Sequence, residues 1–276
     1  MNPIMNTIPL VPFENLRASS EIGKNYHLEC TQCGKCCSDG PQLTFLEAFA
    51  LRDTLPMRMN ISVSSAAPTD AYAMAHIEFA QKMGVLQMRE GLIKKSIYVS
   101  PFTYQYQNGR CIALSTDGSC SIYAHRPSIC KSVPMVTFSP DSHMAGRLDS
   151  FGEKFGCLTK KEGSELSVEG LNENRRAIYD DVQYSSMAAL IMAEMVSMQP
   201  GRRSVGSVHI AILFEAVAQQ TQSNVGHAKM FAESQLALLK KLVADAIQRK
   251  NKSDMPVTRE YREMIQELEA YLSPKI

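Results

Sequence analysis

Four cysteines fall within the eight-residue segment CTQCGKCC near the start of the chain. They are Cys30, Cys33, Cys36 and Cys37, with the spacing C-x2-C-x2-C-C. A C-x2-C spacing lets two thiolates converge on one metal ion from a tight turn. Soft sulfur ligands select zinc and iron–sulfur clusters. The segment therefore predicts a metal centre built from thiolates.

The other four cysteines follow at wider spacing. They are Cys111, Cys120, Cys130 and Cys157, and the remaining 119 residues contain none. Eight thiols suffice for two four-thiolate sites, or for one site with spare thiols, and we predict all eight as candidate ligands. Cys157 stands outside the two dense segments. Side chains of adjacent residues usually diverge, so we expect Cys36 and Cys37 to serve different ions, or one of them to lie outside the ligand set.

The identity of the metal is an open choice between iron–sulfur and zinc. The first three cysteines match the start of the bacterial ferredoxin run C-x2-C-x2-C-x3-C-P. Gly40 occupies the fourth ligand position of that run, while Pro41 keeps its place. Zinc sites usually show two separated C-x2-C pairs, and the later cysteines form none. The spacing favours a 4Fe–4S cluster, with zinc as the alternative.

Two segments carry a resemblance to a known family. They are CTQCGKCCSDGP and the stretch with Cys111, Cys120, Ile122-Tyr123, Arg126-Pro127 and Cys130. Together they resemble the YkgJ-type cysteine cluster family, also described as the CxxCxxCC zinc- or iron-chelating domain, over roughly residues 28–160. The resemblance implies an iron–sulfur or zinc site.

The same family is related to flagellin lysine N-methylases of the FliB type, which implies protein lysine methylation as an alternative function. The chain differs from the aromatic-flanked cysteine motif of those methylases. Ser38 follows the paired cysteines, and the chain has no tryptophan.

Residues beside the cysteines tune such a site, because nearby cations offset the negative charge of the thiolates. We expect Arg126, in the RP-x2-C turn, to lie beside the ligands and Tyr123 to pack against the cysteine loop. His27 and His125 are near cysteines, and we expect them to be exposed or hydrogen bonded rather than ligating.

The composition indicates which partners and which cellular compartment to expect. The 276 residues carry 29 Lys and Arg against 28 Asp and Glu, a net charge of +1, so no basic excess suggests nucleic acid. The N-terminus has no basic region ahead of an apolar run, and no stretch is long enough to span a bilayer. We therefore expect a cytoplasmic protein with no membrane contact. In a reducing cytosol, clustered cysteines more often bind metal than form disulfides.

The patterns predict an α+β fold: a small loop-rich metal-binding N-terminal unit with a few short strands, packed on a C-terminal helical bundle. We expect an irregular arm (1–26), a cysteine-cluster domain (27–160) and a helical region (161–276). A capping box at Thr44–Glu47 predicts a helix to about 55. The other expected elements are a loop over 56–68, a helix over 70–89, strands over 96–106, 110–114 and 133–138, a turn over 116–119, a short helix from Pro127, a basic loop over 200–204, and helices over 173–199, 205–221, 226–250 and 258–272.

No catalytic motif stands out, so whether the protein is an enzyme stays open. Our leading hypothesis is an iron–sulfur protein with an electron-transfer or redox-sensing role. Its C-terminal helices would cover the site and present a surface to a protein partner. The alternatives are the lysine methylase and a zinc-stabilised structural or interaction module.

Overall fold

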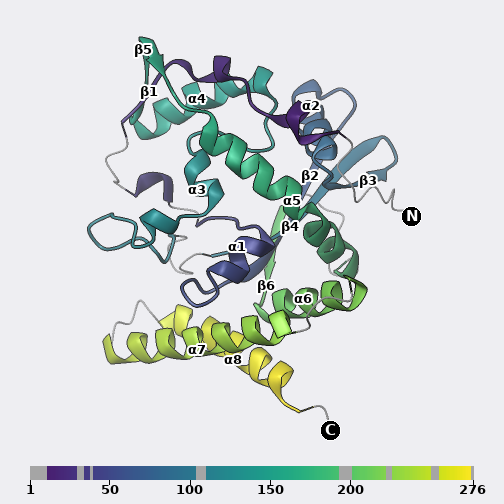
Figure 1. Cartoon of the computed structure of the whole chain (residues 1–276), viewed down its shortest axis with the longest axis vertical. Helices are drawn as coiled ribbons and strands as arrows, with labels where there is room; N and C mark the ends of the chain where they lie inside the picture. Colours follow the sequence, from purple (N-terminus) through teal and green to yellow (C-terminus); the bar gives the residue numbers. More distant parts are fainter. Residues whose placement is uncertain are drawn as a thin grey trace.

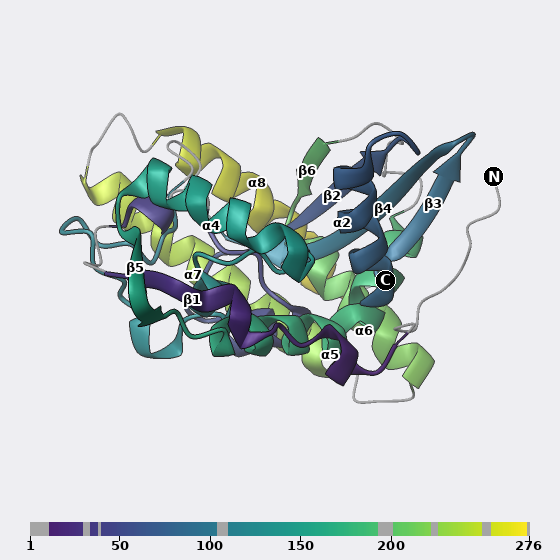
Figure 2. The same ribbon diagram turned by 90° about the horizontal axis from the view of Figure 1, so that it is seen from above.

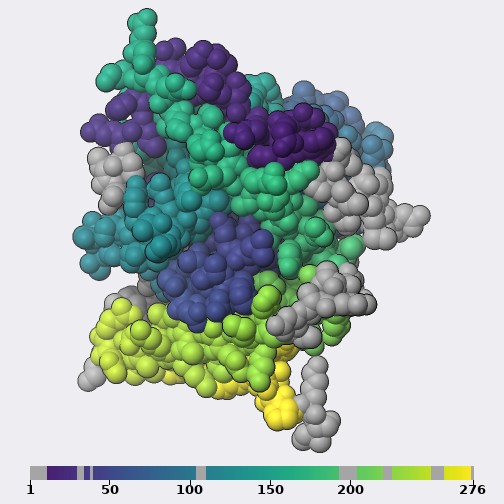
Figure 3. All heavy atoms as spheres, viewed as in Figure 1, coloured from purple at the N-terminus to yellow at the C-terminus, as the bar shows by residue number. Residues whose placement is uncertain are grey.

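The computed structural model describes residues 11–29, 34–37, 40–103, 110–192, 201–221, 226–249 and 255–274. Within these ranges the fold is mixed α+β, as predicted, with two small antiparallel sheets and a set of helices around them (Figure 1). Helices α7 and α8 form one end of the molecule, and the β1–β5 pair lies at the opposite end (Figures 1 and 3).

The larger sheet has the strand order β3-β4-β2-β6, with every neighbouring pair antiparallel. Its strands are β2 (Arg58–Ala66), β3 (Leu86–Glu90), β4 (Ile93–Phe102) and β6 (Gly201–Val205). Figure 2 shows this sheet at one side of the molecule. The predicted strand over 96–106 is confirmed as far as Phe102, and residues 104–109 lie outside the described ranges.

Two loop predictions fall in this sheet and are wrong. Residues 56–68 contain β2, because Met59, Ile61 and Val63 alternate and become buried when the strand is paired on both sides. The serines between them suggested a loop, yet they occupy the opposite face. The prediction of a basic loop at 200–204 is wrong from Gly201 onward, because β6 pairs with β2 there.

The smaller sheet pairs β1 (Lys24–Leu28) with β5 (Leu158–Glu165). Two 3-10 turns precede it, η1 (Phe13–Leu16) and η2 (Ser20–Gly23). Helix α4 (Asp141–Phe155) leads into β5 and ends at Gly156, whose φ of 71° favours glycine. The sequence patterns indicated neither α4 nor β5.

The short helices of the N-terminal half follow their sequence signals more closely. Helix α1 (Phe45–Ala50) has both hydrogen bonds of the capping box, and α3 (Ser128–Ser132) begins after Pro127 as predicted. Helix α2 (Ala71–Lys82) is capped by Asp70 and ends before Gly84, whose φ is 90°, so the prediction to residue 89 was too long. The strands predicted over 110–114 and 133–138 are wrong, because these residues form turns.

The C-terminal helices confirm the helical periodicity of this half. They are α5 (Glu169–Ile191), α6 (Val208–Thr221), α7 (Gly226–Arg249) and α8 (Met255–Leu272). The predicted continuation of the first of them through residues 193–199 lies outside the described ranges. No helix in the described part of the chain is both long and apolar enough to cross a membrane.

One sheet is shared between the segments predicted as separate domains. β6, in the 161–276 segment, pairs with β2, in the 27–160 segment. Gln235 of α7 adds a further link, because its buried amide accepts from the Met57 N–H and donates to the Arg52 and Leu55 carbonyls. The C-terminal helices therefore pack directly on the end of α1 and the start of β2.

Helix α5 runs through the middle of the molecule and holds Arg175, whose side chain is fully buried (Figure 1). The guanidinium donates to the carbonyls of Leu16, Thr137 and Ser139 and pairs with Asp141 at 3.2 Å. A single side chain thus joins the N-terminal arm, the segment before α4 and α5.

Replacing Arg175 tests this link. We expect Arg175→Gln to lower the free energy of unfolding by about 3 kcal/mol, because three buried carbonyls lose their charged donor. Urea denaturation followed by circular dichroism measures the change. Arg176→Gln is the matched control, since Arg176 is exposed, with its guanidinium paired to Asp180 and lying 4.9 Å from the centre of the Phe13 ring, and we expect less than about 1 kcal/mol. Equal losses in the two variants would contradict the assigned role.

Candidate metal centre

Four cysteine thiols come together in the described part of the cysteine domain. Cys37 lies at the end of η3 (Lys35–Cys37), Cys111 and Cys120 lie in one loop, and Cys130 lies in α3. The charges of Cys111 and Cys120 act to raise the pKa of both Cys37 and Cys130, although the hydrogen bond from Cys36 lowers the pKa of Cys37 overall. Segments distant in sequence therefore supply one group of thiols, here called the four-thiol group.

Backbone hydrogen bonds join the two cysteine segments. The Cys111 N–H donates to the Cys37 carbonyl at 3.1 Å, and the Cys37 N–H donates to the Gly34 carbonyl at 3.0 Å. Gly34 has a φ of 71°, and a Cβ at this position would lie 2.9 Å from the Leu114 side chain. A larger residue would be strained in this conformation and would also clash with the loop.

The loop carrying Cys111 and Cys120 closes on itself. Leu114 and Cys120 form an isolated antiparallel bridge, and the Ser121 N–H donates to the Ala113 carbonyl at 2.8 Å. Between these residues lies the turn predicted over 116–119, where Gly118 has a φ of 88°. The turn folds the loop back, so that its two cysteines meet the same group.

Glu47 fixes the helix that carries Cys130. One carboxylate oxygen accepts from the Thr44 N–H at 2.9 Å in the capping box of α1, and the other accepts from the Ser128 N–H at 2.7 Å, at the start of α3. Asn174 of α5 donates to the Ser128 hydroxyl at 2.9 Å. These contacts hold α3 beside α1, the first helix after the CxxCxxCC motif (Figure 1).

Asp181 of α5 holds the other side of α1. Its carboxylate accepts from the N–H groups of Phe45 and Leu46 at 2.7 and 3.2 Å. Burial raises the pKa of Asp181 to about 8, although these two donors act in the opposite direction. Asp180, its neighbour, points away and pairs with Arg176.

Burial keeps two thiols of the group protonated in the absence of metal. It raises the pKa of Cys130 to about 12, assisted by Cys111 and Cys120 and opposed by the Arg126 guanidinium. It also raises the pKa of Cys111, opposed by the amides of Ala113 and Leu114, which hydrogen bond to the sulfur. A bound cation would displace these protons and stabilise the thiolates.

The donor chemistry fits zinc or iron, because the four-thiol group offers sulfur alone. Among the residues with assigned positions, however, no three His, Cys, Asp or Glu side chains are already arranged to hold a metal ion. The described thiols therefore lie close enough for their charges to interact, but they are not arranged as the ligands of one metal ion.

Cys36 and Cys37 do not diverge as expected. The Cys36 thiol hydrogen bonds to the Cys37 sulfur, which raises the pKa of Cys36 and lowers that of Cys37. The short 3-10 turn η3 places them together. Cys36 is exposed, whereas Cys37 is the member of the pair that faces Cys111, Cys120 and Cys130.

Of the three remaining predicted ligands, the structure describes Cys157. Cys30 and Cys33 lie outside the described ranges. The Cys157 carbonyl accepts from the Glu29 N–H at 2.9 Å, which extends the β1–β5 pairing by one step. Cys157 therefore lies beside Glu29, the last described residue before the motif.

The two predicted neighbours of the ligands contact each other. The Arg126 guanidinium lies 4.4 Å from the centre of the Tyr123 ring, and its charge acts on the thiols of Cys36 and Cys130. Tyr123 itself is 44% exposed. Lys131 pairs instead with Glu173 at 2.9 Å. Arg126 is therefore a cation whose charge reaches the thiols, held under an exposed tyrosine ring.

Comparison with known families agrees with the cysteine-rich metal-chelating class that these residues define. Residues 29–157 match the model of the CxxCxxCC family, described as "Putative zinc- or iron-chelating domain". The match begins at Glu29 and ends at Cys157, the two residues joined by a backbone hydrogen bond. A search of curated proteins and a search of solved structures returned no significant match.

Sequence reasoning missed the second role of Glu47. The capping box identified Glu47 as a partner of Thr44, but its contact with Ser128 spans most of the domain in sequence. Asp181 and its neighbour Asp180 point in different directions, as adjacent residues on a helix do. No local pattern indicated that Asp181 alone would cap another helix.

The paired cysteines provide a test of the ligand set. We expect Cys37→Ser to reduce the metal content of the purified protein by more than half, because its sulfur faces three other thiols. Cys36→Ser is the matched control and should retain most of the metal. Elemental analysis of both variants measures the difference. Metal loss from Cys36→Ser with retention in Cys37→Ser would reverse the assignment.

Proposed function

We propose that the CxxCxxCC domain of this protein holds an iron–sulfur cluster of the 4Fe–4S type, which transfers electrons or reports redox state. The observation that carries the proposal is the four-thiol group: Cys37, Cys111, Cys120 and Cys130 lie within electrostatic range of one another, and the Cys111 N–H donates to the Cys37 carbonyl at 3.1 Å. When bound, such a cluster supplies one-electron redox chemistry. The protein's part is to position the thiols and to set the local charge.

Three further features support an iron–sulfur occupant. The first three motif cysteines have the spacing of a ferredoxin loop. The amides of Ala113 and Leu114 donate to the Cys111 sulfur, and hydrogen bonds to sulfur raise the potential of a cluster. Cys36 and Tyr123 are exposed at the edge of the group, which suits electron exchange with a partner.

The location and partner follow from the same chemistry. Free thiols at Cys36, Cys37, Cys111, Cys120 and Cys130 suit a reducing compartment, for which we propose the cytoplasm. We propose that the C-terminal helices present the surface for a protein partner. The lysine methylase alternative rests on the family resemblance alone.

Anaerobic purification tests the cluster. We expect a brown protein with about four iron and four sulfide per chain, together with the broad visible absorption of a 4Fe–4S centre that bleaches on reduction. Aerobic handling of the same preparation is the control, because an exposed cluster edge predicts loss of colour. A colourless anaerobic protein with stoichiometric zinc would establish the zinc-stabilised module instead.

Substitution of Arg126 tests the redox role of the site. Removing this positive charge disfavours the more negative, reduced cluster, so we expect Arg126→Gln to lower the reduction potential by on the order of tens of millivolts. Protein-film voltammetry measures the potential. Lys131→Gln is the control, since the Lys131 ammonium is held by Glu173, and its shift should be smaller. A larger shift in the control would contradict the role of Arg126.

A further inference from the structure

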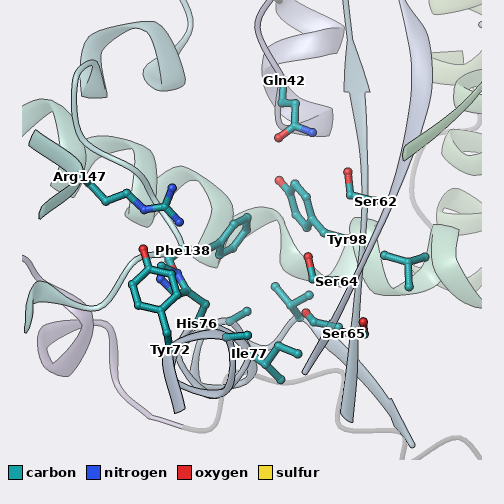
Figure 4. Close-up of a pocket in the computed structure, with 15 residues that line it drawn as sticks. Gln42, Ser62, Ser64, Ser65, Tyr72, His76, Ile77, Tyr98, Phe138 and Arg147 are labelled. Carbon is teal, nitrogen blue, oxygen red and sulfur yellow. The ribbon is translucent and has the colours of Figure 1, made fainter. Parts of the chain in front are cut away.

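A cleft with both polar and apolar lining lies on the face of the larger sheet that turns away from the main core. Its cavity volume is about 460 Å³, within the range of small-molecule sites. Helix α2, the sheet residues of β2 and β4, Phe138 and the α4 residue Arg147 surround it (Figure 4). None of these residues is a candidate metal ligand.

The strand alternation builds a floor of hydroxyl groups. Ser62 pairs with Tyr98 and Ser64 pairs with Ser96, so these four side chains share one face of the sheet. The alternate residues Ile61, Ile97 and Val99 point to the opposite face and pack in the main core. The serines that suggested a loop in the sequence therefore line a cleft.

Tyr98 supplies a hydroxyl group on the floor of the cleft. The residue is 8% exposed, and its hydroxyl makes no hydrogen bond to any residue of the described ranges. Figure 4 shows that hydroxyl directed into the cleft, toward the Gln42 amide. The hydroxyl is therefore free to donate to a polar ligand in the cleft.

The charge of the cleft is positive. No Asp or Glu is among its lining residues, and no carboxylate in the described part of the chain lies within 4.0 Å of the Arg147 guanidinium. The guanidinium instead lies 5.6 Å from the centre of the Tyr72 ring. An unpaired arginine at the rim of a cleft without acids favours an anion.

Two histidines hold the rim in place. The His76 Nδ1 donates to the Phe138 carbonyl at 3.1 Å, and the His143 Nδ1 lies 3.4 Å from the His76 Nε2. The Tyr72 ring stacks on His143 with 4.5 Å between ring centres. Two neighbouring imidazoles can bind a metal cation, but the positive charge of Arg147 beside His76 disfavours a cation here. Their contacts instead fix Tyr72 beneath Arg147.

The walls of the cleft are aromatic and apolar. Phe138 meets the Tyr98 ring edge-on at 5.0 Å, and Ile77 and Ala80 of α2 complete the apolar side. We propose that the cleft binds a small organic anion, with a carboxylate or phosphate group at Arg147 and an aromatic or apolar body over the Tyr98 hydroxyl and Phe138. Arg147 provides the charge and the hydroxyl floor provides the hydrogen bonds.

Titration calorimetry on the purified, metal-loaded protein at low ionic strength tests the cleft. The probes are benzoate, phenyl phosphate, inorganic phosphate and the neutral analogue benzyl alcohol. We expect saturable binding of at least one aromatic anion, with benzyl alcohol and inorganic phosphate at least tenfold weaker. Tighter binding of benzoate assigns a carboxylate ligand, and tighter binding of phenyl phosphate assigns a phosphate ester.

Variants tie the binding to the named residues. Arg147→Gln should weaken the favoured anion at least tenfold, and Tyr98→Phe, which removes only the hydroxyl, should weaken it several-fold. Lys154→Gln is the matched control, because it removes one positive charge from the same helix outside the cleft and should leave affinity unchanged. No binding of either aromatic anion, equal binding of benzyl alcohol or inorganic phosphate, or equal losses in Arg147→Gln and Lys154→Gln would overturn the proposal.

Discussion

The described part of the metal domain depends on two carboxylates that hold short helices by their N-termini. Glu47 bonds to both α1 and α3, and Asp181 bonds to α1 from the buried face of α5. A helix of five or six residues is unstable by itself, so α1 and α3 exist because these side chains accept their free N–H groups. Each such cap contributes about 1 kcal/mol. Without them, Cys130 would have no fixed position relative to Cys37.

The metal domain and the cleft share one structural support, strand β4. The segment after the cysteine motif runs along its end, where the Leu43 N–H donates to the Pro101 carbonyl and Gln42 bridges to Phe102. Earlier in the same strand, Ser96 and Tyr98 form part of the cleft floor. Gln42 thus follows the CxxCxxCC motif closely and also lines the cleft. This arrangement gives a physical connection between the candidate metal centre and the cleft proposed to bind an anion.

Local signals predicted those parts of the fold whose interactions are local. The capping box at Thr44–Glu47, the turn at 116–119 and the short helix after Pro127 are each determined by neighbouring residues, and all three are present. The prediction failed for β2 and β6, because a strand is stable only when a distant strand pairs with it. The serines of β2 resemble a loop until β4 lies beside them.

The sequence by itself determined the chemistry of the metal centre, since residue type fixes the ligand atoms, and eight thiols with this spacing select zinc or iron. Tertiary structure alone decided which thiols meet. Sequence distance does not fix spatial distance across long loops, so contacts such as Cys111 with Cys37, and Glu47 with Ser128, choose the members of the group. The cleft is also a tertiary product, because its charge and hydroxyl groups come from α2, α4 and two strands that the fold brings together.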